Sequence, residues 1–460
     1  MLGNFKLQTL KQKLWAIVAA SFVARVIMFF ALPSSQPLLP DEHTYSQLAR
    51  WVSDSKPAIP ASGYYEGLYV SSRSITLPTS FLVRAGIGEL DASRLISSAY
   101  GFLGLVVLVI FVLGVFKKNE RDISGYFDQN LLFSLILVFA FFPSHFLWSI
   151  LGLRESGNEF WLILTFFAAF LLYEEKQKKK FLIGLLIFIS IVGTFSSRPK
   201  VAWVLVVSLF IFSLFKLRNK VTYLLIVSVF TGLFVGYLAT SSNVFVTSDV
   251  YIAKNGSTTS KNASKLCKGT KAIIEYKGES YSCVKSGTTT SRLRTSDLAE
   301  TAVAQIELIP EMQSLNQVNA NSKIQRLTCP WDEVSMTGKY ACLAYRAPYM
   351  TSTFLFRPLP ILDTTSLISV IAAIENISWI FMFWLILHRI IKVRKVPFFG
   401  QLAPPVIFFS LFLVGAGLYQ GNLGTAFRHK SLVLWIVLLL IFMTSKAMAS
   451  RENPKDTVTS

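Results

Sequence analysis

Two adjacent carboxylates, Asp41 and Glu42, follow the first long apolar segment and are the best candidates for acid–base chemistry. They belong to Pro40-Asp41-Glu42-His43-Thr44-Tyr45, which continues into a pattern that predicts an amphipathic helix on a membrane surface. A carboxylate held there can act as a general base toward a hydroxyl group. A purely structural role also fits, in which Asp41 caps the helix and Glu42 complements its dipole.

Positive and titratable side chains recur at the ends of apolar segments on the same predicted side of the membrane. Any one of them is explained by a long side chain that reaches the lipid headgroups. As a set beside carboxylates they favour an anionic lipid-linked substrate, because arginine binds phosphate in a bidentate manner. The set comprises Arg94, Arg154, Glu155, Arg198, Lys200, Arg357, Arg428, His429 and Lys430.

The composition places these residues in a membrane protein. Of 460 residues, 52% are hydrophobic and only 15% are charged, against about a quarter charged in a soluble domain. This excludes a soluble enzyme, a disordered protein and a fibrous repeat. The net charge of +19 could suggest nucleic-acid binding, but charge that sets membrane topology explains it without such a partner.

Ten segments are apolar enough to predict membrane-spanning helices, each needing about 20 residues. The fold class is therefore an all-α polytopic membrane protein, with surface helices in the first outer loop. The expected spans are 14–32, 95–116, 130–148, 158–173, 181–195, 201–215, 221–238, 367–387, 404–418 and 431–445.

The distribution of basic residues predicts the orientation. With a cytoplasmic N-terminus, the six cytoplasmic pieces hold 20 of the Lys and Arg residues and three short outer loops hold five. This positive-inside pattern predicts a multi-pass protein of the plasma (inner) membrane with both termini cytoplasmic. The site at the end of the first span is then extracytoplasmic.

Two long outer loops divide the chain into three parts. Residues 1–238 form an N-terminal transmembrane module with seven spans, which includes the first outer loop, 33–94. Residues 239–366 form an extracytoplasmic loop domain, and residues 367–460 form a C-terminal module with three spans.

All four cysteines, Cys267, Cys283, Cys329 and Cys342, lie in the segment 239–366. Four cysteines allow three pairings, and we expect Cys267–Cys283 and Cys329–Cys342 in an oxidising compartment. A zinc site is the rival interpretation, but the segment has no C-x-x-C spacing and no histidine.

Motifs in nearly the whole chain resemble the GT-C superfamily of membrane glycosyltransferases. The similarity is to the branch of protein O-mannosyltransferases, aminoarabinose transferases and related bacterial surface-polysaccharide enzymes of the cell envelope. Each motif is weak alone, and together they are moderately specific. They are Pro40-Asp41-Glu42-x-x-Tyr45, Ser93-Arg94-Leu95, Phe142-Pro143-Ser144, Leu153-Arg154-Glu155 and Asn422-x-Gly424-Thr425-x-x-Arg428.

The resemblance implies an inverting transfer of a sugar from a polyprenyl-phosphate donor to a glycan, lipid or protein acceptor. Asp41 is the expected general base, with Glu42 as its neighbour or alternate. Glu155 either orients Arg154, acts as a second acid, or merely neutralises Arg154. The lipid phosphate would be bound by Arg154, Arg198 and Arg428, with Arg94 and His429 behind them.

The chain departs from the family in two respects. Some members bind a divalent metal, but three consecutive side chains such as Asp41, Glu42 and His43 diverge, so we expect no metal and no cofactor. Protein O-mannosyltransferases carry a β-trefoil insert, which the segment 239–366 does not match. The alternative functions are a polysaccharide repeat-unit polymerase and, less favoured, a transporter or a non-catalytic envelope-assembly protein.

Overall fold

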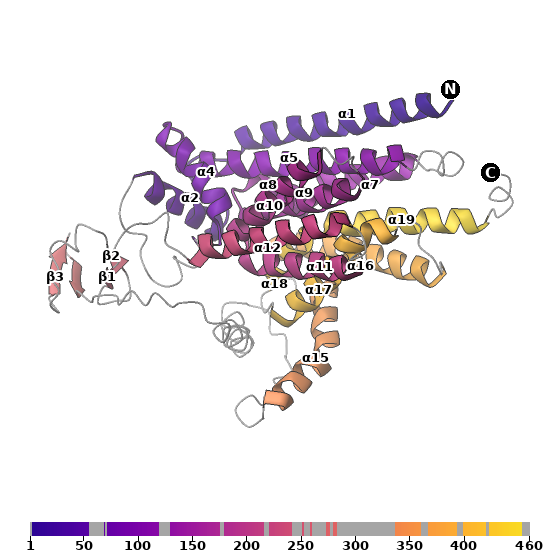
Figure 1. The fold of residues 1–460 in the computed structure, drawn as a ribbon. Helices are drawn as coiled ribbons and strands as arrows, with labels where there is room; N and C mark the ends of the chain where they lie inside the picture. Colours follow the sequence, from indigo (N-terminus) through magenta and orange to yellow (C-terminus); the bar gives the residue numbers. More distant parts are fainter. Residues whose placement is uncertain are drawn as a thin grey trace.

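The computed structural model of the 460-residue chain is an elongated bundle of helices (Figure 1). The beginning of the first helix, α1, and the end of the last, α19, lie at the same end of the bundle (Figure 1). The structure describes residues 2–54, 69, 71–118, 129–174, 179–215, 220–241, 251–252, 258–259, 273–276, 279–282, 336–359, 367–392, 399–419 and 423–452.

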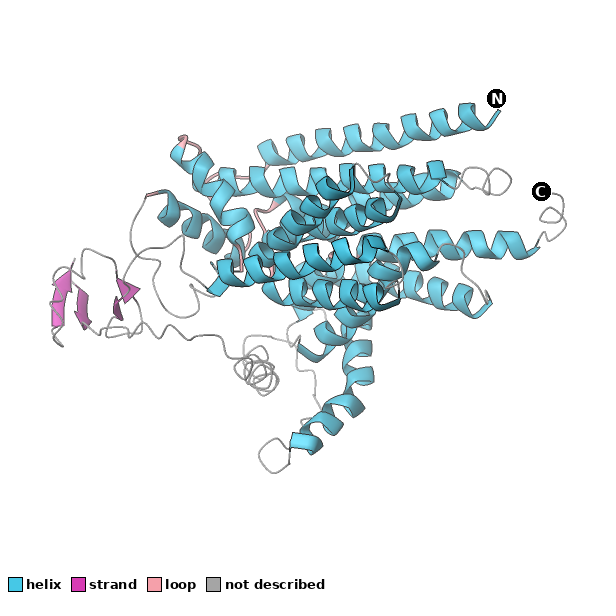
Figure 2. Ribbon diagram, in the orientation of Figure 1, coloured by secondary structure: helices cyan, strands magenta, loops and turns pink. Residues whose placement is uncertain are grey.

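Helices make up almost all of the described chain (Figure 2). The N-terminal part contains α1 (Leu2–Ala31), α2 (Pro40–Ser53), α4 (Arg73–Arg84), α5 (Glu89–Lys118), α7 (Gln129–Phe141), α8 (Pro143–Ile150), α9 (Arg154–Glu174), α10 (Lys180–Ser197), α11 (Pro199–Phe215) and α12 (Lys220–Ser241). The C-terminal part contains α15 (Met336–Phe356), α16 (Leu367–Lys392), α17 (Phe399–Tyr419), α18 (Leu423–Ser431) and α19 (Leu434–Glu452).

Five of these helices are long and apolar enough to cross a membrane, which supports the expectation of a membrane protein. A sixth candidate is the bent pair α7 and α8. Nine of the ten expected spans each coincide with one apolar helix and the third coincides with the bent pair α7 and α8, but the apolar parts of α11, α12, α17 and α19 are only 10–17 residues long. The number of ten crossings therefore stays a prediction.

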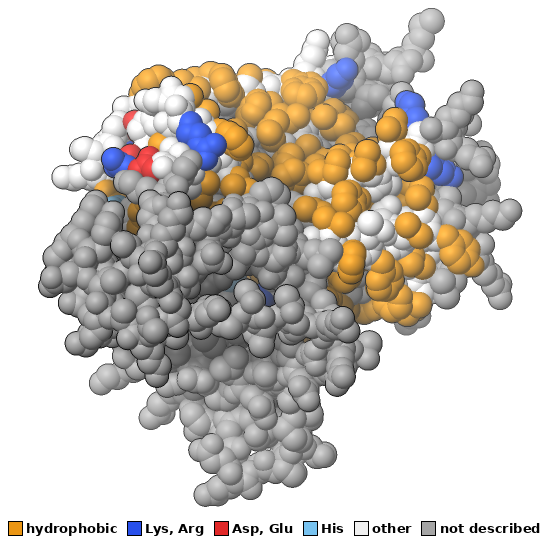
Figure 3. Space-filling model, turned by 60° about the vertical axis from the view of Figure 1, so that its left-hand side comes forward, with side chains coloured by type: hydrophobic (Ala, Val, Ile, Leu, Met, Phe, Trp, Pro, Cys, Tyr) orange, Lys and Arg blue, Asp and Glu red, His pale blue; other side chains and the backbone are white. Residues whose placement is uncertain are grey.

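The outer surface of the bundle is strongly apolar. Large side chains such as Phe30, Phe181 and Phe215 are 73–80% exposed. In Figure 3 hydrophobic side chains cover most of the described surface, and charged side chains gather toward its ends. A lipid environment accounts for this surface, whereas water would make it costly.

The third expected span is broken at Pro143. Helices α7 and α8 meet at Phe142 at an angle of 43°. Proline has no backbone N–H and cannot continue the hydrogen bonding of α7, so Pro143 becomes the first residue of a new helix. The break places Ser144 and His145 in the interior, where both are buried.

Within residues 33–94 the structure describes the helices α2 and α4, which pack on each other and on α5. In α2 the buried side chains include Tyr45, Leu48 and Ala49, whereas Arg50 is exposed, as expected of an amphipathic helix. The N-cap residue of α2 is Leu39, and no side chain caps the helix, so Asp41 does not have the capping role.

The segment 239–366 contains more regular structure than its sequence predicts. Two short antiparallel pairs join β1 (Tyr251–Ile252) to β2 (Thr258–Thr259) and β3 (Ile273–Tyr276) to β4 (Glu279–Ser282). Helix α15 has only a moderately apolar sequence and contains Pro348, so it escaped prediction. Cys342 lies in α15 and is disulfide-bonded. Cys267, Cys283 and Cys329 lie outside the described residues, so their pairing stays a prediction.

Candidate functional site

Asp41 forms an ion pair with Arg428, from the opposite end of the chain. Arg428 Nη1 donates to Asp41 Oδ2 at 2.5 Å. Asp41 is in the first turn of α2 and Arg428 in the last turn of α18, where the two helix dipoles favour their charges. The Asp41 side chain is 37% exposed, compared with 18% for Arg428. The Asp41 carboxylate is therefore more accessible to a bound molecule than the Arg428 guanidinium is.

Glu155 lies behind Asp41, between two arginines. It forms an ion pair with Arg198, and its Oε1 is 4.0 Å from Nη1 of Arg428. Its side chain is only 2% exposed, so these two partners are needed to offset the loss of hydration. Among the described contacts Glu155 holds Arg198 and Arg428, rather than its neighbour Arg154.

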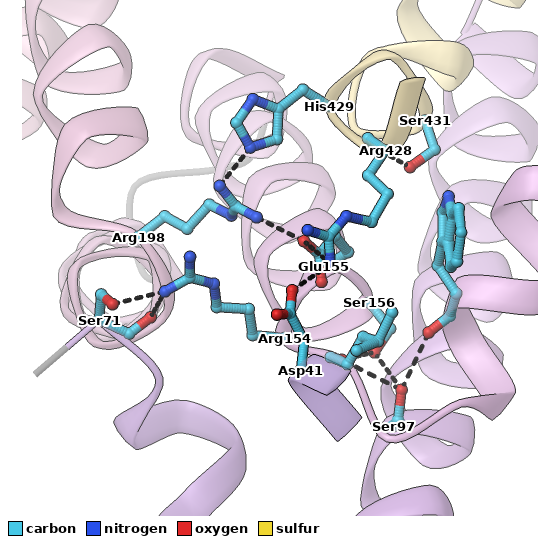
Figure 4. Close-up of polar contacts among 12 residues, drawn as sticks. Asp41, Ser71, Ser97, Arg154, Glu155, Ser156, Arg198, Arg428, His429 and Ser431 are labelled. Carbon is cyan, nitrogen blue, oxygen red and sulfur yellow. Dashed lines mark hydrogen bonds and ion pairs between the residues drawn. The ribbon is translucent and has the colours of Figure 1, made fainter. Parts of the chain in front are cut away.

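Arg154, Arg198 and Arg428 form a cluster with Asp41, Glu155 and His429. Within the described contacts of this cluster, Arg154 is held by Ser71 and Tyr45 and not by a carboxylate. Its Nη1 donates to the carbonyl of Ser71 at 2.9 Å and to the hydroxyl of Ser71 at 2.5 Å. Its guanidinium also lies over the ring of Tyr45, 5.7 Å from the ring centre. In Figure 4, Arg198 and Arg428 point toward the two carboxylates, whereas the guanidinium of Arg154 points toward Ser71.

A tight turn sets the position of Arg154 and Glu155. Residues 151–153 join α8 to α9, and Gly152 adopts φ +67°, which favours glycine. A Cβ atom on Gly152 would lie 2.7 Å from the Ser93 hydroxyl, which itself donates to the Gly152 carbonyl. Ser97 also donates to the carbonyl of Leu153 at 3.1 Å. The start of α9 is thus fixed against α5.

Arg198 is the single residue between α10 and α11. It precedes Pro199 and has the extended backbone that a following proline favours. Burial and then Arg154 lower the pKa of Arg198 to about 10, so the side chain stays charged at neutral pH. The helix ending and the proline together direct one cation into the cluster.

His429 accepts a hydrogen bond at Nε2 from Nη1 of Arg198. Burial lowers its pKa well below the ordinary value, and Arg198, Arg428 and Arg154 lower it further. His429 is therefore neutral at physiological pH. It orients Arg198, and it does not supply the positive charge that a phosphate-binding role would require.

The cluster carries a net positive charge. Three arginines stand against Asp41 and Glu155, with His429 neutral, which leaves a formal charge of +1. Burial lowers the pKa of Arg428, but Glu155 and Asp41 more than offset this, and the net pKa is raised. The Nε atoms of Arg154 and Arg198 are buried and make no hydrogen bond within the described chain. These donors suit an anionic group.

Tyr45 is a member of the cluster that sequence reasoning missed as a site residue. It lies one helical turn after Asp41, so its position on the same face of α2 was predictable. Burial raises its pKa to about 12, so its hydroxyl remains protonated. Ser71 was also missed, because nothing in the sequence links it to Arg154.

Glu42 and Arg94 form a separate buried pair and do not join the cluster. Arg94 Nε donates to Glu42 Oε1 at 2.7 Å, and both side chains are fully buried. Arg94 also donates to the carbonyls of Pro33 and Gln36, and Glu42 accepts from the backbone N–H of Leu38. These contacts fix the connection from α1 to α2, which gives Glu42 and Arg94 the geometry of positioning residues.

No family model, curated protein or solved structure matches the chain. Within the described ranges there is also no group of three or more His, Cys, Asp or Glu side chains that could hold a metal ion. The expectation of a metal-independent reaction stays a prediction.

Proposed function

We propose that the chain is an integral-membrane glycosyltransferase acting at the extracytoplasmic face. It transfers a sugar from a polyprenyl-phosphate donor to a glycan, lipid or protein acceptor, with inversion at the anomeric carbon. The observation that carries this proposal is the cluster itself, in which the accessible carboxylate Asp41 pairs with Arg428 and the neighbouring Glu155 interacts electrostatically with Arg154, Arg198 and Arg428. Apolar helices long enough to cross a membrane support this proposal, because a lipid-linked donor resides in a membrane.

In the proposed reaction Asp41 accepts the proton of the acceptor hydroxyl. The acceptor oxygen forms a bond to the anomeric carbon on the face opposite the phosphate. The bond from that carbon to the phosphate oxygen breaks, and its electron pair remains on the departing polyprenyl phosphate. Arg154, Arg198 and Arg428 offset the negative charge that develops there.

The ion pair of Asp41 with Arg428 fits this sequence of events. A phosphate that binds Arg428 competes with Asp41 for the guanidinium, because both are anions. The carboxylate then becomes a better proton acceptor when the donor is in place. Glu155, which is deeply buried, keeps Arg198 and Arg428 in position throughout.

A repeat-unit polymerase is the second candidate, because the same arginine cluster suits a lipid diphosphate. The two reactions differ in their products. The transferase releases polyprenyl monophosphate, whereas the polymerase lengthens an oligosaccharide on polyprenyl diphosphate. Mass spectrometry of the lipid products from reconstituted protein separates them.

The decisive test replaces Asp41 by Asn and measures sugar transfer from a panel of polyprenyl-phosphate hexoses and pentoses. Loss of a general base lowers kcat by roughly 10²- to 10⁴-fold, and we expect a fall in this range. Glu89→Gln is the matched control, since Glu89 is an exposed acid paired with Arg50 near the same end of the bundle. We expect the control to retain wild-type kcat. Full activity of the Asp41 variant would contradict the base assignment.

A further inference from the structure

Lys430 is a buried cation that the proposed reaction does not use. It follows His429 directly in α18, and the residue is only 1% exposed. Its ammonium group donates to the carbonyls of Leu355 at 2.9 Å and Arg357 at 2.7 Å, and to the side chain of Asn376. These three acceptors match the three protons of an ammonium group.

The acceptors show what Lys430 holds. Helix α15 ends at Phe356, and the last carbonyls of a helix have no partner within it. Lys430 satisfies two carbonyls at this end, and the Asn376 amide donates to the Phe356 carbonyl at 2.7 Å. A cation also interacts favourably with the negative end of the helix dipole. Lys430 therefore joins α18 to the C-terminal end of α15.

Glu375, which precedes Asn376 in α16, extends this connection to α8. Glu375 accepts hydrogen bonds from the backbone and the hydroxyl of Ser144, both at 2.7 Å, and from the indole of Trp379 at 3.2 Å. Ser144 belongs to α8, which also packs on α18. The neighbouring residues Glu375 and Asn376 thus link α8, α15 and α18 through buried polar contacts.

Helix α18 depends on such contacts. It has only nine residues, and a helix of that length is unstable in isolation. Successive residues of a helix point about 100° apart, so an anchor at Lys430 leaves Arg428 and His429 free to face other elements. Those two residues contact Asp41 and Arg198.

We propose that Lys430 is a positioning residue for the arginine cluster. By binding the C-terminal end of α15, it holds α18 in the rotation that directs Arg428 to Asp41 and His429 to Arg198. The effect on ligand binding rests on the proposed function, whereas the effect on α18 does not.

The charge of Lys430 gives this role a pH dependence. Burial lowers its pKa to about 7, although the charge of Glu375 acts to raise it. The other titratable or charged side chains that flank its contacts are Arg357, His145, Arg428 and His429. As pH rises from 6.5 to 8.5 the ammonium loses a proton and hence one of its three hydrogen bonds. A phosphate monoester, with a second pKa of about 6, gains negative charge over the same range.

The test measures the Kd of polyprenyl phosphate for purified protein in nanodiscs. Lys430→Met is expected to weaken binding at least tenfold, and Asn376→Ala, a milder variant, is expected to act in the same direction. In the wild type, binding weakens from pH 6.5 to 8.5 despite the increasing charge of the ligand. Lys430→Arg keeps its charge, so it restores binding relative to Lys430→Met and does not show this weakening.

Arg389→Met is the matched control. Arg389 lies about 20 Å further along α16 than Asn376 and likewise bridges helices, donating to Ile441 and Ser445 of α19. Its loss is expected to lower the thermal stability and to leave the Kd within about twofold of wild type. If Lys430→Met lowers stability to the same extent with an unchanged Kd, the positioning role is overturned.

Hydrogen exchange of residues 423–431 gives a readout that is independent of the ligand. Exchange there is expected to accelerate in Lys430→Met and not in Arg389→Met. Unchanged exchange in Lys430→Met would overturn the positioning role. Accelerated exchange in a protein whose wild type does not bind polyprenyl phosphate would support positioning and reject the proposed function.

Discussion

Three consecutive basic residues of α18 have three different partners. Arg428 contacts Asp41, His429 accepts from Arg198, and Lys430 binds the end of α15. In the sequence they form one basic run. On a helix they diverge, because each residue is rotated by about 100° from the last. One residue of the run can therefore bind an anion while its neighbours provide support.

The same geometry explains which site residues the sequence could identify. Residue type and location near span ends placed Asp41, Arg154, Arg198 and Arg428 among a wider set of candidates, and the structure brings these four together although Asp41 and Arg428 are 387 positions apart. Residue type alone could not distinguish Asp41 from Glu42, because their different directions depend on how α2 packs. Glu42 turns inward to Arg94, and Asp41 turns to Arg428.

His429 is expected to make the protein less stable in acid. Its pKa in the folded protein is well below the ordinary value of 6.5, so below pH 6.5 the unfolded chain binds more protons there than the folded chain does. The free energy of unfolding then falls by up to about 1.4 kcal/mol for each pH unit below 6.5. The loss of thermal stability from pH 7 to 5 should be smaller in His429→Gln, which cannot take up this proton. An equal loss in both proteins would contradict a neutral, buried His429.

At the scale of the helices, α1, α8 and α9 are joined by buried charges. His145 Nδ1 lies 2.7 Å from Glu159 Oε2, and Glu159 interacts electrostatically with Arg25 of α1. The His145 and Glu159 side chains are only 2% and 5% exposed. Arg25 lies within the first expected span, 14–32, as the sequence shows, but the break at Pro143 that turns His145 inward required the structure.

Removal of Glu159 should destabilise this helix contact strongly. Glu159→Leu leaves Arg25 and His145 buried without their acidic partner, which typically costs about 3–5 kcal/mol. The additional change Arg25→Leu removes the uncompensated charge and is expected to recover part of the loss. Thermal unfolding in detergent measures both effects. A double variant less stable than Glu159→Leu would show that Arg25 stabilises the bundle independently of Glu159.

The long apolar helices were predictable from the sequence, whereas α15 was not. Long apolar runs predicted α1, α5, α9, α10 and α16, because a lipid-facing helix must be apolar over its whole length. Helix α15 was missed because it is held by contacts with α17 and by the contacts of Lys430 with its end. The hydropathy of a segment does not predict such contacts with other helices.

For the whole molecule, the arrangement of the chain ends constrains the topology. The beginning of α1 and the end of α19 lie at one end of the bundle, which requires an even number of crossings (Figure 1). Both ten crossings and six crossings, the latter without the four shorter helices α11, α12, α17 and α19, satisfy this condition. Parity alone does not choose between them.

Reporter fusions after residues 124, 218 and 300 distinguish the two topologies. With an N-terminus in the cytoplasm, both topologies place residue 124 inside and residue 300 outside. Residue 218 follows six crossings in the ten-span topology and five in the other. We expect it inside, because Lys216, Arg218 and Lys220 form a basic connection of the kind that stays cytoplasmic. Alkaline phosphatase fused after residue 218 should therefore be inactive, and fused after residue 300 it should be active. An active fusion at 218 would show that α11 does not cross the membrane, and an active fusion at 124 would reverse the orientation and place Asp41 on the cytoplasmic side.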